Sequence, residues 1–270
     1  YRVRSTAPGA EPAKVTEQQS ARREHAAKAR LLRRELEAWH RRADDPSQAV
    51  AAAWPYLAHS DPWIRHAARV AIEHQPPDAW RNRVSADDAA GLWGALVLVK
   101  TGQPQDAQRA VDVALARTTR DVSASDALAD VGRDERLRLA IRIIQMARAM
   151  LGDDASDLNA RITKTFDPLY PHASAEVNRD LATLLTDLRA PDVVDRTTTL
   201  LSQEPDPRWP MHYLFVLRHM RDGWTLDTRR AYFRALRSAV DHLGGAGMPG
   251  FLKRIREEAV ATLSDDEKGA

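Results

Sequence analysis

The 270-residue sequence contains no cysteine. This absence excludes disulfide bonds, thiol catalysis, iron–sulfur ligation and covalent haem attachment through a Cys-x-x-Cys-His motif within these residues. The sequence also lacks a run of about 18 apolar residues, the length typical of a transmembrane helix, and shows no signal peptide. None of these features identifies a cellular compartment.

Aromatic residues and lysine are also scarce. Aromatics make up 6% of the chain while hydrophobic residues make up 43%, which indicates a core of Ala, Leu and Val, as in helix-on-helix packing. Arginine supplies 34 of the 40 basic residues, and the 38 acidic residues reduce the net charge to +2. Because the planar arginine fork bridges carboxylates, this balance favours an intramolecular Arg/Asp/Glu network. A nucleic-acid-binding protein that uses its arginines is the alternative, although a clear positive excess would be expected for it.

The clearest predicted helix covers residues 62–74. Ser60 or Asp61 can cap its start, and Pro62 occupies the first helical position. Its apolar residues fall on one face of a 3.6-residue period, and their small size allows close approach of another helix: Ile64, Ala67, Ala68, Ala71 and Ile72. A short amphipathic helix at residues 46–57 precedes it, so the two form a predicted helical hairpin.

Similar hairpins begin near positions 46, 87, 133, 174 and 207. Two-helix units spaced by roughly 40–47 residues are typical of HEAT and armadillo repeats. The sequence therefore predicts an all-α fold of the HEAT/armadillo type, an α-α superhelix (solenoid) of about five helical hairpins. A long helix at residues 15–42 precedes the hairpins, and a capping helix at residues 249–263 follows them.

The predicted domain organisation has three parts. Residues 1–4 alternate apolar and basic side chains, like the end of a β-strand, and Pro8, Gly9 and Pro12 then end this pattern. Residues 1–14 are therefore predicted to be the end of a preceding domain and a linker. Residues 15–264 form the helical-repeat domain, in which no helix is assigned to the polar span 117–132. Residues 265–270 form an acidic tail. Because the chain starts without methionine, we expect a fragment of a longer polypeptide.

The histidines, the paired carboxylates and the glycine-rich stretch, which often form catalytic or binding sites, have structural explanations in this sequence. The nine histidines form no His-Glu-x-x-His motif, and His66 and His74 would lie more than about 10 Å apart on a straight helix, too far to share a zinc ion. The carboxylate pairs sit at predicted helix starts or in the tail, where they complement the helix dipole: Asp44-Asp45, Asp87-Asp88, Asp153-Asp154 and Asp265-Asp266. The glycine-rich stretch at residues 244–247 follows no strand, so it is predicted to be a turn. We therefore predict no catalytic, cofactor-binding or metal-binding residue.

Seven tryptophans remain, and several lie at predicted helix ends, where an indole can pack its ring inward and hydrogen-bond at the rim. The alternative is a stacking platform for nucleic acid or sugars. The candidate site residues are Asp61, Arg65 and Arg69. Their spacing suggests a ladder of acid and base between successive repeats, with Arg65 one helical turn after Asp61. The alternative is that Arg65 or Arg69 reaches a binding partner.

Several stretches carry a resemblance to a known family. Six stretches resemble the helical-repeat region of large secreted multidomain proteins of planctomycete-type bacteria: residues 61–76, 178–185, 223–225, 230–233, 244–245 and 251–256. In that family a sugar-dehydrogenase-like propeller commonly precedes the repeats, and a cytochrome c domain commonly follows. The resemblance implies an extracytoplasmic (periplasmic) scaffold or protein-interaction module, without enzymatic activity or a cofactor of its own.

The same resemblance implies that the partners are the flanking domains of the same polypeptide or another protein, with haem in a flanking domain. A redox enzyme, in which this chain lines a pocket completed by those domains, is a further alternative. A downstream Cys-x-x-Cys-His motif in the gene would favour it.

Overall fold

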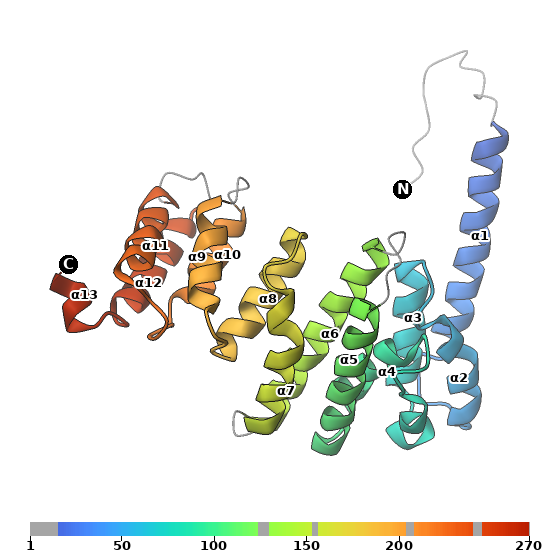
Figure 1. Cartoon of the computed structure of the whole chain (residues 1–270). Helices are drawn as coiled ribbons and strands as arrows, with labels where there is room; N and C mark the ends of the chain where they lie inside the picture. The colour runs from blue at the N-terminus through green and yellow to red at the C-terminus, as the bar shows by residue number, and fades with distance from the viewer. Residues whose placement is uncertain (1–15, 124–129, 153–155, 204–207, 240–244, 270) are drawn as a thin grey trace, which may run out of the picture. The chain divides into compact units, whose positions relative to one another are not determined.

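A computed structural model describes residues 16–123, 130–152, 156–203, 208–239 and 245–269. These residues form α-helices joined by short turns and 3₁₀ segments, and they contain no β-strand (Figure 1). The prediction of an all-α fold is confirmed. Among the described helices, none combines the length and the apolar character needed to cross a bilayer.

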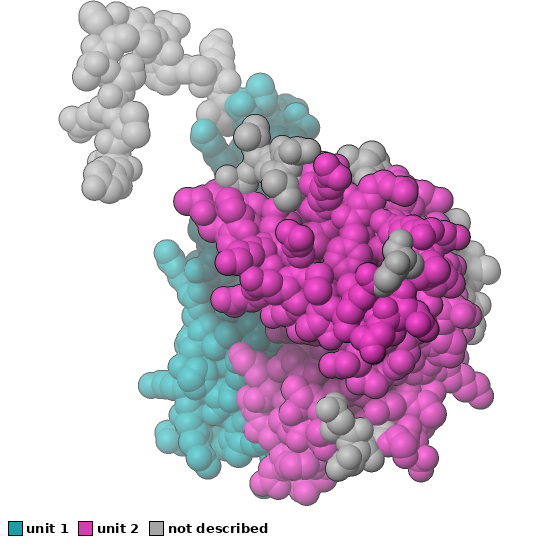
Figure 2. Space-filling view, turned by 90° about the vertical axis from the view of Figure 1, so that its left-hand side faces the viewer, with its two compact units in different colours: residues 1–80 teal, residues 81–270 magenta. Residues whose placement is uncertain are grey.

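The contacts divide the chain into two compact units, unit 1 at residues 1–80 and unit 2 at residues 81–270 (Figure 2). In unit 1, helix α3 packs against α1 and α2. The bounds are α1 Glu17–Glu37, α2 Pro46–Ala53 and α3 Pro62–Glu73. Thr16 caps α1, because its hydroxyl accepts from the Gln19 amide while the Gln19 side chain accepts from the Thr16 amide.

Helix α3 has the start and the buried face that the sequence predicts. Asp61 is its N-cap and Pro62 its first residue. All five residues of the predicted apolar face are buried: Ile64, Ala67, Ala68, Ala71 and Ile72. Because three of them are alanines, α3 lies close to its neighbours, and any larger side chain there would need the helices to separate.

Unit 2 contains the remaining helices. Their bounds are α4 Gly91–Thr101, α5 Pro104–Ser123, α6 Asp130–Leu151, α7 Ser156–Phe166, α8 Ala175–Asp187, α9 Val193–Gln203, α10 Arg208–Leu217, α11 Leu226–Ala239, α12 Met248–Val260 and α13 Asp265–Gly269. Most helices pack against both the next helix and the one after it, as α4 does with α5 and α6 and as α10 does with α11 and α12. Close neighbours in space are thus close neighbours in sequence.

Two segments differ from their predicted conformation. The polar span 117–132 contributes to α5 as far as Ser123 and to α6 from Asp130. Arg117 approaches Asp121 one turn later at 3.9 Å, which shows how a polar sequence follows the helical period. In the acidic segment, Asp265–Gly269 form α13, because the Ser264 hydroxyl accepts from the Glu267 amide and the Glu267 carboxylate accepts from the Ser264 amide.

Some predictions concern residues outside the described part of the chain. They are the preceding domain and linker at residues 1–14, residues 124–129 of the polar span, the carboxylate pair Asp153-Asp154, the hairpin start near position 207, and the first glycine of the turn at 244–247.

Candidate interaction groove

The predicted site residue Asp61 organises the start of α3. Its Oδ1 accepts hydrogen bonds from the backbone amides of Trp63 at 2.8 Å and Ile64 at 3.4 Å. Arg65 donates to the carbonyl oxygen of His59 at 2.7 Å. Both side chains therefore stabilise the turn between α2 and α3.

Arg69 lies further along the same helix. Its Nη1 is 2.5 Å from Glu73 Oε1, and its Nη2 is 3.1 Å from His66 Nδ1. The structure thus brings Asp61 and Arg65 together at one end of α3 and places Arg69 with Glu73 towards the other. A ladder from these residues to a neighbouring repeat stays a prediction.

The histidines take several positions. His40 stacks on His74 with ring centroids 6.3 Å apart, and His59 accepts a hydrogen bond from the Asp61 amide. Within the described ranges, no group of three or more His, Asp or Glu residues is arranged to hold a metal ion.

Three tryptophans illustrate two kinds of environment. Trp80 is buried and donates its indole N–H to the Gln75 carbonyl oxygen at 3.2 Å, and Trp224 donates to the Met220 carbonyl oxygen at 2.9 Å. Trp63 instead exposes 68% of its surface at the start of α3. The inward-packing prediction therefore fits Trp80 and Trp224 and is wrong for Trp63.

Sequence reasoning did not identify the arginine–carboxylate pairs that join separate helices of unit 2. Four of them connect residues 38 to 42 positions apart: Arg138–Asp180, Arg148–Asp187, Arg218–Glu258 and Arg229–Glu267. Their N···O distances lie between 2.6 and 2.9 Å. The sequence signal for these pairs is an arginine followed by an Asp or Glu about one predicted repeat later. Because arginine and acidic residues are both abundant, this signal could not be told apart from chance pairings.

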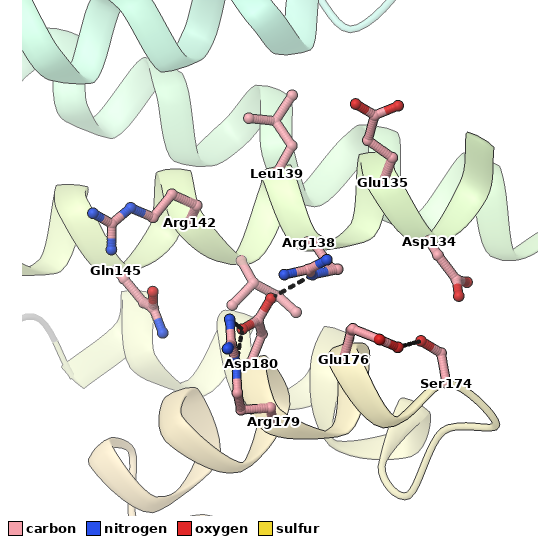
Figure 3. A pocket seen from close by; sticks show the side chains of 11 residues that line it. Asp134, Glu135, Arg138, Leu139, Arg142, Gln145, Ser174, Glu176, Arg179 and Asp180 are labelled. Carbon is pink, nitrogen blue, oxygen red and sulfur yellow. Dashed lines mark hydrogen bonds and ion pairs between the residues drawn. The ribbon is translucent and has the colours of Figure 1, made fainter. Parts of the chain in front are cut away.

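One of these pairs lies in a groove of about 830 Å³ between α6 and α8. Four α6 residues that line the groove recur every three or four positions, so they share one face of that helix: Glu135, Arg138, Arg142 and Gln145. Asp134, Leu139 and Ile141 of α6 also line it. The start of α8 supplies the opposite wall, with Ser174, Glu176, Arg179 and Asp180. Figure 3 shows both walls.

Asp180 is the centre of the groove's charge network. Arg138 Nε from α6 donates to Asp180 Oδ2 at 2.8 Å, and Arg179 donates to Asp180 Oδ1 at 3.3 Å (Figure 3). Arg142 is exposed and has no contact marked in that view. The groove therefore holds one fixed ion cluster beside an arginine that faces solvent.

The backbone beneath Arg179 is held from the next helix. His212 of α10 places Nε2 3.0 Å from both the Arg179 carbonyl oxygen and the Thr183 hydroxyl. Burial lowers the pKa of His212, because desolvation disfavours the imidazolium, although the Arg179 carbonyl opposes that effect. A neutral His212 thus supports the α8 wall of the groove at neutral pH.

The rim of the groove is fixed by the α8 cap. The Ser174 hydroxyl accepts from the Val177 amide at 3.4 Å and lies 3.2 Å from Glu176 Oε2 (Figure 3). Four carboxylates and three guanidinium groups line the groove in all, so it offers both signs of charge. Such a surface suits a ligand that carries both signs.

Comparisons with known proteins identified no relative of this chain. No family model, no curated protein and no solved structure matches the chain. The resemblance to the planctomycete repeat region accordingly stays a prediction.

Proposed function

We propose that the chain is a non-catalytic HEAT/armadillo-like scaffold that binds a protein segment in the α6–α8 groove. The groove carries the proposal, because it is preformed, lies between helices of successive hairpins and presents fixed charges of both signs. Protein partners are recognised through complementary charge patterns of this kind.

The spacing of the inter-helix ion pairs supports a repeat architecture. Pairs that join positions 38, 39, 40 and 42 residues apart link α6 to α8, the end of α10 to α12, and α11 to α13, each about one predicted hairpin later. A stack of two-helix units of this period brings equivalent positions side by side. Groove residues on α6 and α8 would then occupy corresponding places in adjacent units.

A protein ligand fits the groove better than nucleic acid does. A phosphate backbone would meet the carboxylates of Asp134, Glu135 and Glu176 as well as the arginines, and like charges brought together cost binding energy. A polypeptide that carries both acidic and basic side chains avoids this repulsion.

The family resemblance supplies the wider context of the proposal. It implies a larger extracytoplasmic, redox-linked protein around the scaffold, with a flanking domain or a separate protein as the partner and haem in a flanking domain. Sequencing the gene on both sides checks this context directly, since a downstream Cys-x-x-Cys-His motif supports it and unrelated flanks contradict it.

The groove itself is tested by site-specific photo-crosslinking in the polypeptide that the gene encodes. A photoreactive residue replaces Arg142 in the groove, and a matched variant replaces the exposed Arg254 of α12. We expect a protein adduct from position 142 that is absent from position 254, and we expect Glu135→Lys to reduce it. Equal adducts from both positions would contradict the groove.

A filter-binding measurement at low salt addresses the nucleic-acid alternative. Retention of nucleic acid that declines steeply as salt is added, and that Arg142→Gln weakens, would replace the proposal with that alternative.

A further inference from the structure

A second cavity, of about 150 Å³, lies between α4, α5 and α6 and contains an excess of positive charge. Arg117 of α5 and both Arg133 and Arg136 of α6 line it, and Asp121 is its only carboxylate. None of these residues belongs to the α6–α8 groove.

The single carboxylate is already engaged. Asp121 Oδ2 accepts from Arg136 Nε at 2.7 Å, and its Oδ1 lies 3.9 Å from Arg117 Nη2. Arg117 also donates Nη1 to the Ala86 carbonyl oxygen at 3.3 Å, while its buried Nε makes no hydrogen bond with any described residue. Asp121 therefore serves both Arg136 and Arg117, so one carboxylate faces two guanidinium groups and this part of the cavity wall stays net positive.

His172 lines the same cavity. Its Nδ1 accepts a hydrogen bond from the Ser174 amide at 3.1 Å, so in the neutral ring the proton is on Nε2. Nε2 lies 3.9 Å from Asp134 Oδ1, beyond hydrogen-bond distance. The Nε2–H of His172 is thus a hydrogen-bond donor among the residues that line the cavity.

The remaining walls are apolar and buried, with Leu92, Leu137 and Ala140 among them. A protein cavity of about 150 Å³ holds a molecule of the size of benzene. The available space therefore limits a ligand to roughly that size, with one charged end and a short apolar body.

We propose that this cavity binds a small oxyanion, a carboxylate or phosphate group carried by a compact molecule. Guanidinium groups bind either group through paired N–H···O contacts, and a small rotation of the Arg117 guanidinium brings its Nε–H into such a pair. The apolar walls favour a short organic body over a strongly hydrated inorganic ion.

Calorimetric titration of the whole chain tests this site with two probes, butyrate and inorganic phosphate, at constant ionic strength. We expect saturable binding of at least one probe at millimolar concentration. Preference for butyrate identifies a carboxylate ligand with an apolar body, and preference for phosphate identifies a phosphoryl group. No saturable binding of either probe overturns the proposal.

Matched variants locate the binding. Arg117→Gln and Arg133→Gln each remove one lining charge, and Arg254→Gln makes the same change at an exposed position of α12 outside the cavity. We expect about tenfold weaker binding in the first two variants, the loss of one charge-assisted contact, and unchanged binding in the third. Equal weakening in all three would indicate general charge attraction and would overturn the site.

Circular dichroism verifies that each variant is folded. Where a glutamine variant does not fold, Arg133→Lys keeps the charge but removes the planar fork. Weaker binding in Arg133→Lys supports the site, and undiminished binding contradicts it.

Discussion

The two units use hydrogen bonds of different kinds to hold their helices together. In unit 1 the buried amide of Gln75 donates to the Arg41 carbonyl oxygen at 2.9 Å and accepts from the Ala43 amide at 3.1 Å, so neutral groups fix the chain after α1. In unit 2 arginine forks span from one helix to another, as Arg148 does to Asp187 at 2.9 Å. Unit 1 therefore depends on neutral contacts and tight alanine packing, whereas unit 2 also depends on charge.

Arg229 is the example of a buried, charged contact between helices of unit 2. Its side chain is 4% exposed, it lies over the Trp224 ring at 4.0 Å, and it donates to Glu267 at 2.7 Å. We expect Arg229→Leu to lower the free energy of unfolding of unit 2 by about 3–5 kcal/mol, because Glu267 loses its countercharge while partly buried. Urea unfolding followed by circular dichroism measures the change.

The double variant Arg229→Leu/Glu267→Leu serves as the control. Removing both charges should recover much of the lost stability. If the double variant is as unstable as the single one, packing against Trp224 and not charge is the dominant contribution of Arg229.

Gln75 marks the neutral extreme. We expect Gln75→Leu to destabilise unit 1 by about 1–3 kcal/mol, because the Ala43 amide and the Arg41 carbonyl lose their side-chain partner. Urea unfolding monitored by tryptophan fluorescence is suitable, since Trp54 and Trp80 lie in the same unit. The same substitution at the exposed Gln105 should change stability by less than about 0.5 kcal/mol.

Asp61 should contribute less than Gln75, because the hydrogen bonds described for Asp61 cap one helix, whereas those of Gln75 join segments more than 30 residues apart. Asp61→Ala is expected to cost about 1 kcal/mol, and Asp61→Asn much less, since asparagine also accepts from the first amides of a helix. A cost above about 3 kcal/mol for the alanine variant in urea unfolding would show that Asp61 also joins α3 to another element.

His212 gives a smaller, pH-dependent test of unit 2. Its pKa is lowered in the folded chain because burial disfavours the charged ring, so the unfolded chain binds the proton more readily. The stability contributed by the neutral ring is complete above the unfolded pKa of about 6.5 and declines as the pH falls through it. Thermal melting between pH 8 and pH 5 should show this decline, and His212→Gln should flatten it.

Much of the helical framework could be predicted from the sequence. Local signals decide helix starts, and the Asp61-Pro62 start and the alanine face of α3 are found as predicted. Helix α13 shows that charge composition alone does not predict conformation. The segment was predicted to be an acidic tail, but Ser264 and Glu267 form a capping pair that starts a helix there. There a local hydrogen-bond pattern outweighs acidic composition.

The candidate groove was not predictable in the same way. Arg138 and Asp180 are 42 residues apart, and many other carboxylates were possible partners for each arginine. Ion-pair choice depends on which helix faces meet, which is a property of packing and not of local sequence. Asp61, Arg65 and Arg69 stood out because they are close in sequence, and the contacts described for them are likewise short-range.

The inter-helix arginine–carboxylate pairs should make the measured stability of unit 2 depend on which chemical denaturant is used. Guanidinium chloride supplies in solution the same cation that an arginine side chain carries, and at molar concentration it also screens charge over about 3 Å. It therefore competes directly for Asp180, Asp187, Glu258 and Glu267, whereas uncharged urea leaves those carboxylates with their arginines. Unit 2 should appear less stable in guanidinium chloride than in urea once the usual twofold difference in denaturing strength is taken into account, and unit 1 should rank alike in both.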